Sequence, residues 1–474
     1  MPQTGLRIRW QQPTLPVEDI VTEAPAAAIP LTERESVHRM ILRVGIPVVE
    51  GATTAKEVAI GLLKLAAEFE HALLVQYLYA AFSLPNEVGP DSINYHQRVL
   101  TVAIQEMGHL TSLQNLLLLL GGTDAFYMQR DLLRESSDKN PIPFVLEPIS
   151  KTSLAKYVAA EKPAQVPPEL AAKVDELVKL AEQDAGVETH RVGVIYELLK
   201  WIFQPPGDAP TDIDFSSLIP LPENPHITDE DLQDNLEIVP KFEALAEEWQ
   251  VFFEDVILPT VHNVAEAHDV LDRIARQGEG LTSGGPSHFT EFMAIVAAFE
   301  AGNVSVKPMP KAPILDGETG ALISHPYTRL WVEVFNRQYD LLVLAIYHSL
   351  VTPRPDDGSQ GLRDRLAQMA IRSMRRVITP LANLISSLPL REDNSAARGG
   401  PSFDLDASIL NSKEQDDLVA QQNRLLDNLA TLYTGIESSP HFAANPNHVN
   451  ALTNLRNIDQ VRRNLVPPPA PPTP

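Results

Sequence analysis

The chain of 474 residues is 44% hydrophobic, a proportion typical of a folded globular protein. Acidic residues outnumber basic ones by 62 to 38, and the formal net charge of -24 argues against nucleic acid as a partner, because phosphate binding requires a basic surface. Cysteine is absent, which excludes disulfides, thiolate metal sites and cysteine nucleophiles, so a metal ion would be held by oxygen and imidazole ligands.

The N-terminal residues lack the continuous apolar segment of a signal peptide. The sequence has no run of about 18 apolar residues, and its most apolar stretch, 116–120, ends at a pair of glycines. We therefore expect a cytoplasmic protein with no membrane partner.

The N-terminal third of the sequence predicts an arm followed by two long helices. Residues 1–50 contain several prolines, and we expect them to form an arm that wraps the main body. From 54 to 84 apolar residues recur at steps of three and four, which predicts a helix. A second helix is expected over about 91–120, because the glycine pair at 121–122 supplies a helix end.

The remainder of the sequence is also mainly helical, and convincing strand alternation is scarce, so the predicted class is mainly α. The main domain is expected to span 51–404, with inserts at about 123–187 and 205–240. Residues 405–465 are expected to form a C-terminal helical extension, followed by a proline-rich tail at 466–474. The further predicted helices are 188–203, 240–277 with a kink at Pro259, one beginning at His288, 327–350 and 362–388.

Three ionisable residues lie on the apolar faces of the first two predicted helices. Glu106 and His109 are three residues apart and share a helix face with leucines, and Glu70 lies on the apolar stripe of the preceding helix. Two antiparallel helices would bring a carboxylate and a Glu-x-x-His motif into one apolar space, as in di-iron and di-manganese carboxylate bundles. Two interpretations stay open at this point: a metal site, or a buried pair whose charges satisfy each other.

Three other residues are ambiguous from spacing alone. Glu279 follows a predicted helix, where the helix dipole disfavours an anion, and His288 begins the next helix. Both fit an ordinary polar turn as well as a functional site. Glu197, on the third predicted helix, fits a solvent-exposed position as well as a ligand position.

Several separated motifs resemble the ferritin-like domain of iminophenyl-pyruvate dimer synthases, which act in violacein-type and rebeccamycin-type biosynthesis. The similar segments are EHALLVQYLYA at 70–80, QEMGH at 105–109, NLL at 115–117, LEPI at 146–149, SLAKY at 153–157, QGEG at 277–280, SHF at 287–289 and GGPSF at 399–403. The resemblance covers about residues 54–404, and the motifs occur in the same order as in that family.

This resemblance implies a ferritin-like four-helix bundle with long inserts and additional C-terminal helices. It also implies a metal site for iron, as one or two ions, with manganese as an alternative, and the ligands that it indicates are Glu70, Glu106, His109, Glu279 and His288. One departure concerns Val194, which stands where the family carries a glutamate. Glu197 or Glu188 could substitute for that ligand, or one metal position could be lost.

The resulting hypothesis is a non-haem, iron-dependent oxidoreductase that acts on a small organic substrate, with imine dimerisation in amino-acid-derived natural-product biosynthesis as a lead. The alternative is a non-catalytic ferritin-like scaffold that binds metal or handles an intermediate for a partner. A homo-oligomer and a partner oxidase are both compatible with the sequence.

Overall fold

The computed structural model describes residues 7–13, 40–86, 93–130, 144–185, 192–204, 213–249, 255–279, 287–393 and 396–465. The expected tail at 466–474, most of the expected arm and Glu188 lie outside this described part. No helix within it is long and apolar enough to cross a membrane. The domain boundaries expected at residues 50 and 404 stay a prediction.

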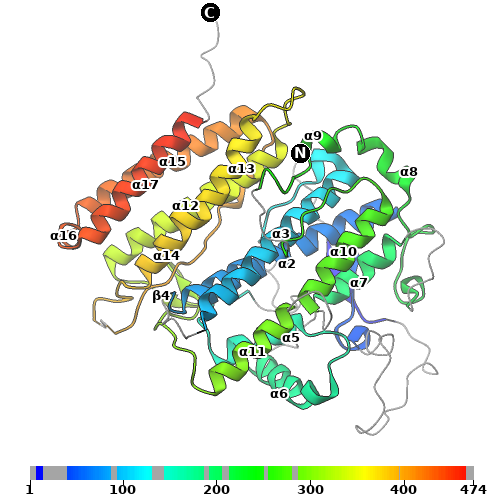
Figure 1. Ribbon diagram of the computed structural model, residues 1–474, viewed down its shortest axis with the longest axis horizontal. Helices are drawn as coiled ribbons and strands as arrows, with labels where there is room; N and C mark the ends of the chain where they lie inside the picture. Colours follow the sequence, from blue (N-terminus) through cyan, green and yellow to red (C-terminus); the bar gives the residue numbers. More distant parts are fainter. Residues whose placement is uncertain are drawn as a thin grey trace, which may run out of the picture.

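The centre of the fold is an antiparallel pair of long helices, α2 (Ala55–Phe82) and α3 (Tyr95–Gly121) (Figure 1). Thr54 and Glu57 form a capping box at the start of α2, which satisfies two of the free backbone N–H groups there. Gly122 ends α3 with a φ of 62°, a left-handed conformation that glycine adopts without steric strain. Both helices are buried around most of their circumference, because other helices cover two of their sides.

One of these sides is covered by short helices. They are α5 (Lys151–Glu161), α7 (Gly193–Ile202), α10 (Val264–Glu279) and α11 (His288–Glu300). Helix α10 packs on α7 and α11 packs on α5, and both α10 and α11 contact α3. Figure 1 shows α10 and α11 following one another along the central pair. The helix α6 (Pro168–Ala185) packs on the outer side of α5.

A C-terminal group of helices forms a second layer, drawn in yellow to red in Figure 1. Its members are α12 (Pro326–Val351), α13 (Leu362–Ser373), a π-helical turn (Met374–Ile378), α14 (Thr379–Ile385), α15 (Gln415–Glu437) and α17 (Pro446–Leu465). Helix α12 is the core of this layer, since it packs on α13, α14 and α15, and α14 reaches α2. The prediction of additional C-terminal helices is confirmed.

Strands in the described residues are short, which confirms the mainly α class. The strand β1 (Ile8–Gln11) pairs antiparallel with β2 (Ile46–Val49), and β2 contacts α2. The strands β3 (Pro313–Ile314) and β4 (Ala321–Leu322) form a parallel pair. The remaining short elements are Gly122–Ala125, Phe215–Ser217, α8 (Asp229–Leu232), Gln233–Asn235, α9 (Val239–Phe242), Ala407–Leu410 and α16 (Pro440–Ala443).

The expectation of a kinked helix over 240–277 is wrong for its first half. Helix α9 ends at Phe242, α10 begins only at Val264, and the described residues between them are not helical. Side chains of α3 form hydrogen bonds with backbone groups of these residues instead. Asn115 accepts from the N–H of Ala244 and donates to its carbonyl oxygen, and Ser112 donates to the carbonyl oxygen of Ile257. These described residues therefore lie against α3, and Asp255 among them contacts Gln105 of that helix.

Candidate metal centre

The first group of candidate ligands comes from the central helix pair. Glu70 on α2 and Glu106 and His109 on α3 face one another, as their positions on the apolar stripes predict. The Nδ1 atom of His109 lies 2.9 Å from Oε2 of Glu106 and 3.2 Å from Oε2 of Glu70. All three residues are buried, so the charges of this group are shielded from solvent.

A second group lies beside the first and shares Glu106 with it. His288 begins α11, where Ser287 caps the helix, and Glu161 ends α5. The Nδ1 atom of His288 lies 3.1 Å from Oε1 of Glu106 and 3.7 Å from Oε2 of Glu161. One oxygen of Glu106 thus faces each histidine, and the two imidazole rings are 5.6 Å apart between centroids.

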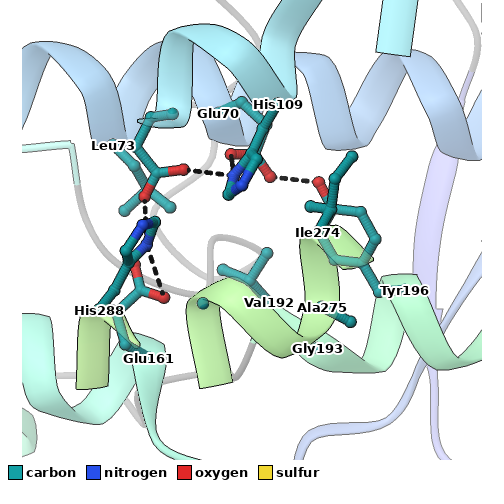
Figure 2. Close-up of a pocket in the computed structure, with 12 residues that line it drawn as sticks. Glu70, Leu73, His109, Glu161, Val192, Gly193, Tyr196, Ile274, Ala275 and His288 are labelled. Atoms are coloured by element: carbon teal, nitrogen blue, oxygen red, sulfur yellow. Dashed lines mark hydrogen bonds and ion pairs between the residues drawn. The ribbon is translucent and has the colours of Figure 1, made fainter. Parts of the chain in front are cut away.

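Figure 2 shows the two histidines and the carboxylates around one small pocket between the helix layers. Within each group the candidate ligand atoms lie within 4.8 Å of one another, a spacing that a single ion can bridge. The pocket has a volume of about 20 Å³, which is close to the space that one water molecule needs. Its other wall consists mainly of α7 and α10 residues: Gly193, Tyr196, Ile274, Ala275 and Gly278.

Two glutamines determine which nitrogen of each histidine faces the carboxylates. The side-chain oxygen of Gln277 lies 2.8 Å from Nε2 of His109, and that of Gln105 lies 3.1 Å from Nε2 of His288. Because an amide oxygen only accepts hydrogen bonds, Nε2 of each histidine carries a proton. Nδ1 of each ring therefore faces the carboxylates, and either a second ring proton or a bound metal ion can lie between them.

The orientation of both glutamines is fixed by one residue, Asp255. The amide nitrogen of Gln105 donates to Oδ2 of Asp255 at 2.8 Å, and that of Gln277 donates to its backbone oxygen at 2.6 Å. With each amide nitrogen occupied in this way, each amide oxygen is left to face a histidine. Asp255 is itself exposed, so the support of the buried centre extends to the surface.

Two atoms of the centre are buried without a hydrogen bond among the described residues. They are Oε1 of Glu106 and Nδ1 of His288, which lie 3.1 Å apart but are not aligned as donor and acceptor. Leaving two such atoms unsatisfied in the interior costs several kcal/mol. A metal ion between them would satisfy both, and carboxylate with imidazole is a donor set that suits iron, manganese or zinc.

The ionisation of the metal-free centre points to the same deficit of positive charge. Burial and the neighbouring Glu106 raise the pKa of Glu70 to about 8. Burial opposes the charged form of His109, but Glu106 and Glu70 outweigh it and raise its pKa to about 10. Burial likewise opposes a charged His288, yet Glu106 and Glu161 raise its pKa to about 9. Burial would also raise the pKa of Glu106, and the two histidines hold it well below its ordinary range instead. Without metal, Glu70 and the two histidines therefore bind protons more tightly than usual, and these protons supply the positive charge that the buried carboxylates require.

Two tyrosine hydroxyls donate to the outer carboxylates. Tyr196 on α7 donates to Oε1 of Glu70, and Tyr77 on α2 donates to Oε1 of Glu161. Each of these carboxylates thus keeps its other oxygen, Oε2, for the side of the histidines. The hydroxyls hold the carboxylates in place without adding charge.

The predicted ligands are therefore brought together only in part. Glu70, Glu106, His109 and His288 lie in the two groups, whereas Glu197 belongs to neither. The Glu197 side chain is partly exposed and pairs with Lys200 at 2.8 Å. Glu279 is the last residue of α10, and its side chain is outside the described part of the structure.

Sequence reasoning missed Glu161. Val194, the apolar departure on the third helix, is fully buried, and Glu161 from a different helix supplies the third carboxylate of the centre, after Glu70 and Glu106. The only signal in the sequence is its place at the end of a helix, before Lys162 and Pro163, where an anion is unfavourable next to the helix dipole.

Comparisons with known proteins agree with this architecture. Residues 63–297 match the family model described as Ferritin-like. Over an alignment of 132 residues, the chain is 29% identical to a 2-imino-3-(indol-3-yl)propanoate dimerase of Chromobacterium violaceum. The match covers 22% of the present chain and only 13% of that relative. No solved structure matches the chain.

Proposed function

Because residues 63–297 form a ferritin-like domain, we propose that it holds a pair of non-haem metal ions, preferably iron, and that the protein is an oxidoreductase acting on a small organic substrate. Manganese is the alternative metal. The observation that carries the proposal is the pair of donor groups that share Glu106, each with the Nδ1 atom of one histidine turned toward carboxylates.

In this proposal each ion has its own histidine and its own outer carboxylate. Glu70 and His109 would hold one ion, Glu161 and His288 would hold the other, and Glu106 would bridge them. Bound iron would supply redox chemistry with dioxygen at a site from which bulk water is largely excluded. The glutamines keep both imidazoles in the metal-binding tautomer, as outer partners do in other metal centres.

The substrate would approach from the side of α7 and α10. There the pocket wall contains Gly193, Ala275 and Gly278, whose small size leaves space next to the ligands. A Cβ atom at Gly278 would lie 3.0 Å from Oε2 of Glu161, so glycine keeps this carboxylate oxygen accessible. The name of the relative makes aromatic 2-imino acids the first substrates to test.

The experiment is metal analysis of the full chain after loading with iron or manganese. We expect about two ions per chain in the wild type, and a Glu161→Gln variant should retain about one, because the second group loses a charged ligand. A Glu106→Gln variant should lose both. Glu197→Gln is the matched control, since Glu197 pairs with Lys200 away from the centre, and it should keep two.

Dioxygen consumption with an aromatic 2-imino acid, generated in situ, then tests the reaction. Turnover that falls with metal content in these variants would support the oxidoreductase. A wild-type chain that binds no metal, or a Glu161→Gln variant with full metal content, would refute the proposed centre. Full metal content without turnover on any small substrate would favour the metal-binding scaffold instead.

A further inference from the structure

A second cavity lies on the opposite side of the central helices, between α2 and α3 and the C-terminal layer. Its volume is about 150 Å³, and it shares no lining residue with the metal centre. Engineered protein cavities of about this volume bind benzene, so the space is large enough for an organic molecule. It is lined by α2, α3, α12, α13 and the π-helical turn 374–378.

The wall on the central helices is apolar and incompletely covered. Leu74 and Leu78 on α2 and Ile104 and Met107 on α3 line the cavity and remain partly exposed, although they lie between two helix layers. The opposite wall is formed by buried residues of α12 such as Leu342. Apolar surface left uncovered at such a position is a feature of small-molecule sites.

The polar side chains at the buried end of the cavity, His71 and Tyr339, form hydrogen bonds with each other and with the backbone. His71 hydrogen-bonds the carbonyl oxygen of Met128 through Nδ1 at 3.1 Å, so Nδ1 carries the proton. Its Nε2 atom then accepts from the hydroxyl of Tyr339 at 2.5 Å. This end of the cavity therefore suits the apolar part of a ligand.

The only cation that lines the cavity, among the described residues, is Arg375. It lies on the π-helical turn, is exposed, and forms no ion pair with any residue that the structure describes. Arg372 and Arg376, on the same stretch, are also exposed and unpaired within the described residues. In a chain with a net charge of -24, three unpaired arginines in five residues are a marked local excess of positive charge. A π-helical turn inside a helix frequently occurs at functional sites.

We propose that this cavity binds a small amphiphilic carboxylate, with its apolar body between α2, α3 and α12 and its carboxylate on Arg375. The apolar wall, the neutral buried end and the unpaired cation together define this class of ligand. Guanidinium is well suited to a carboxylate because it can donate two parallel hydrogen bonds. The inference is independent of the proposed metal chemistry, since the two cavities share no residue.

The test is calorimetric titration of the full chain with octanoate, and with octylammonium and octanol as probes of the same length. We expect saturable binding of one octanoate, tighter than that of octylammonium. Arg375→Gln should weaken octanoate binding about tenfold and leave octanol binding unchanged, because only the charged contact is lost. Arg372→Gln is the matched control, because Arg372 is exposed on the same stretch but does not line the cavity.

A variant that fills the cavity provides the second arm. Ile346→Trp adds volume from α12 and should weaken binding of octanoate and octanol alike. If circular dichroism shows that this variant is unfolded, Thr379→Trp at the cavity wall replaces it. The proposal is overturned if octanoate does not bind saturably, if octylammonium binds as tightly, if Arg372→Gln has the effect of Arg375→Gln, or if a folded, filled variant binds as the wild type does.

Discussion

Gly108, between the two ligands of α3, allows the segment that carries Asp255 to approach the helix closely. A Cβ atom at this position would lie 2.7 Å from Cγ1 of Val256 and 3.2 Å from the backbone oxygen of Ile257. A Gly108→Ala variant would therefore push this segment outward. Asp255, which directly precedes Val256, would then lose its contacts with the two glutamines that orient the histidines.

Two opposing effects determine the stability of this variant. Alanine in a helix interior stabilises by about 1 kcal/mol relative to glycine. Overpacking of a close contact costs about 1–3 kcal/mol. The free energy of unfolding of the metal-free protein should thus fall by about 0–2 kcal/mol. Metal affinity should fall further, by about 10–100-fold or roughly 1.4–2.8 kcal/mol, as when the outer hydrogen-bond partners of ligands are removed.

The assay compares two quantities: urea unfolding of the metal-free chain, and manganese affinity from competition with a chromophoric chelator. Gly435→Ala is the matched control, because it also lies within a helix but its Cβ would be an ordinary 3.5 Å from Leu330. It should stabilise the chain by about 0.5–1 kcal/mol and leave metal affinity unchanged.

A second variant separates the steric effect from the loss of hydrogen bonds. Asp255→Ala removes the carboxylate partner of Gln105 but keeps the backbone oxygen that holds Gln277, so it should weaken only the ion bound through His288. The reasoning is refuted if Gly108→Ala leaves manganese affinity within twofold of the wild type while its stability falls as calculated.

Two further predictions concern the C-terminal layer. Burial raises the pKa of Asp340 to about 6, above its ordinary value near 3.8, so the native state retains a proton that the unfolded state has lost. The stability contribution is therefore complete below about pH 4 and lost as the pH rises through about 6, by up to about 3 kcal/mol, and Asp340→Asn should remove this dependence in urea unfolding between these pH values. Arg363 is fully buried and donates to Glu248 and to the backbone oxygens of Phe242, Glu243, Ser349, Leu350 and Thr352. Arg363→Met should lower the free energy of unfolding by about 3–5 kcal/mol, and a loss below 1 kcal/mol would mean that water replaces these bonds.

The sequence predicts the central helices well because their signals are local. The apolar repeat of α2 begins directly after the cap at Thr54, and α3 ends at Gly122, so both ends can be read from neighbouring residues. The same helices carry Glu70, Glu106 and His109, and helical spacing alone places these residues on facing stripes. The first donor group could therefore be predicted from two short segments.

The second donor group could not be predicted in this way. Glu161 is one carboxylate at the end of a short helix, and its partners Tyr77 and His288 come from distant segments. The described residues of the segment, 243–249 and 255–263, show the same limit, since hydrogen bonds to Asn115 and Ser112 replace the helix that their composition favours. Helix propensity is a weak signal where side chains from elsewhere satisfy the backbone.

The sharing of Glu106 also has a consequence for assembly. The first donor group belongs to a helical hairpin whose ligands are at most 39 positions apart, whereas the glutamine contact of His288 spans 183 positions. Local contacts form faster than distant ones during folding. A newly made chain is therefore expected to present half of the centre first, and an ion that arrives early would occupy Glu70, Glu106 and His109 before α11 docks. Metal supply during folding, rather than affinity alone, would then decide which ion fills the first position.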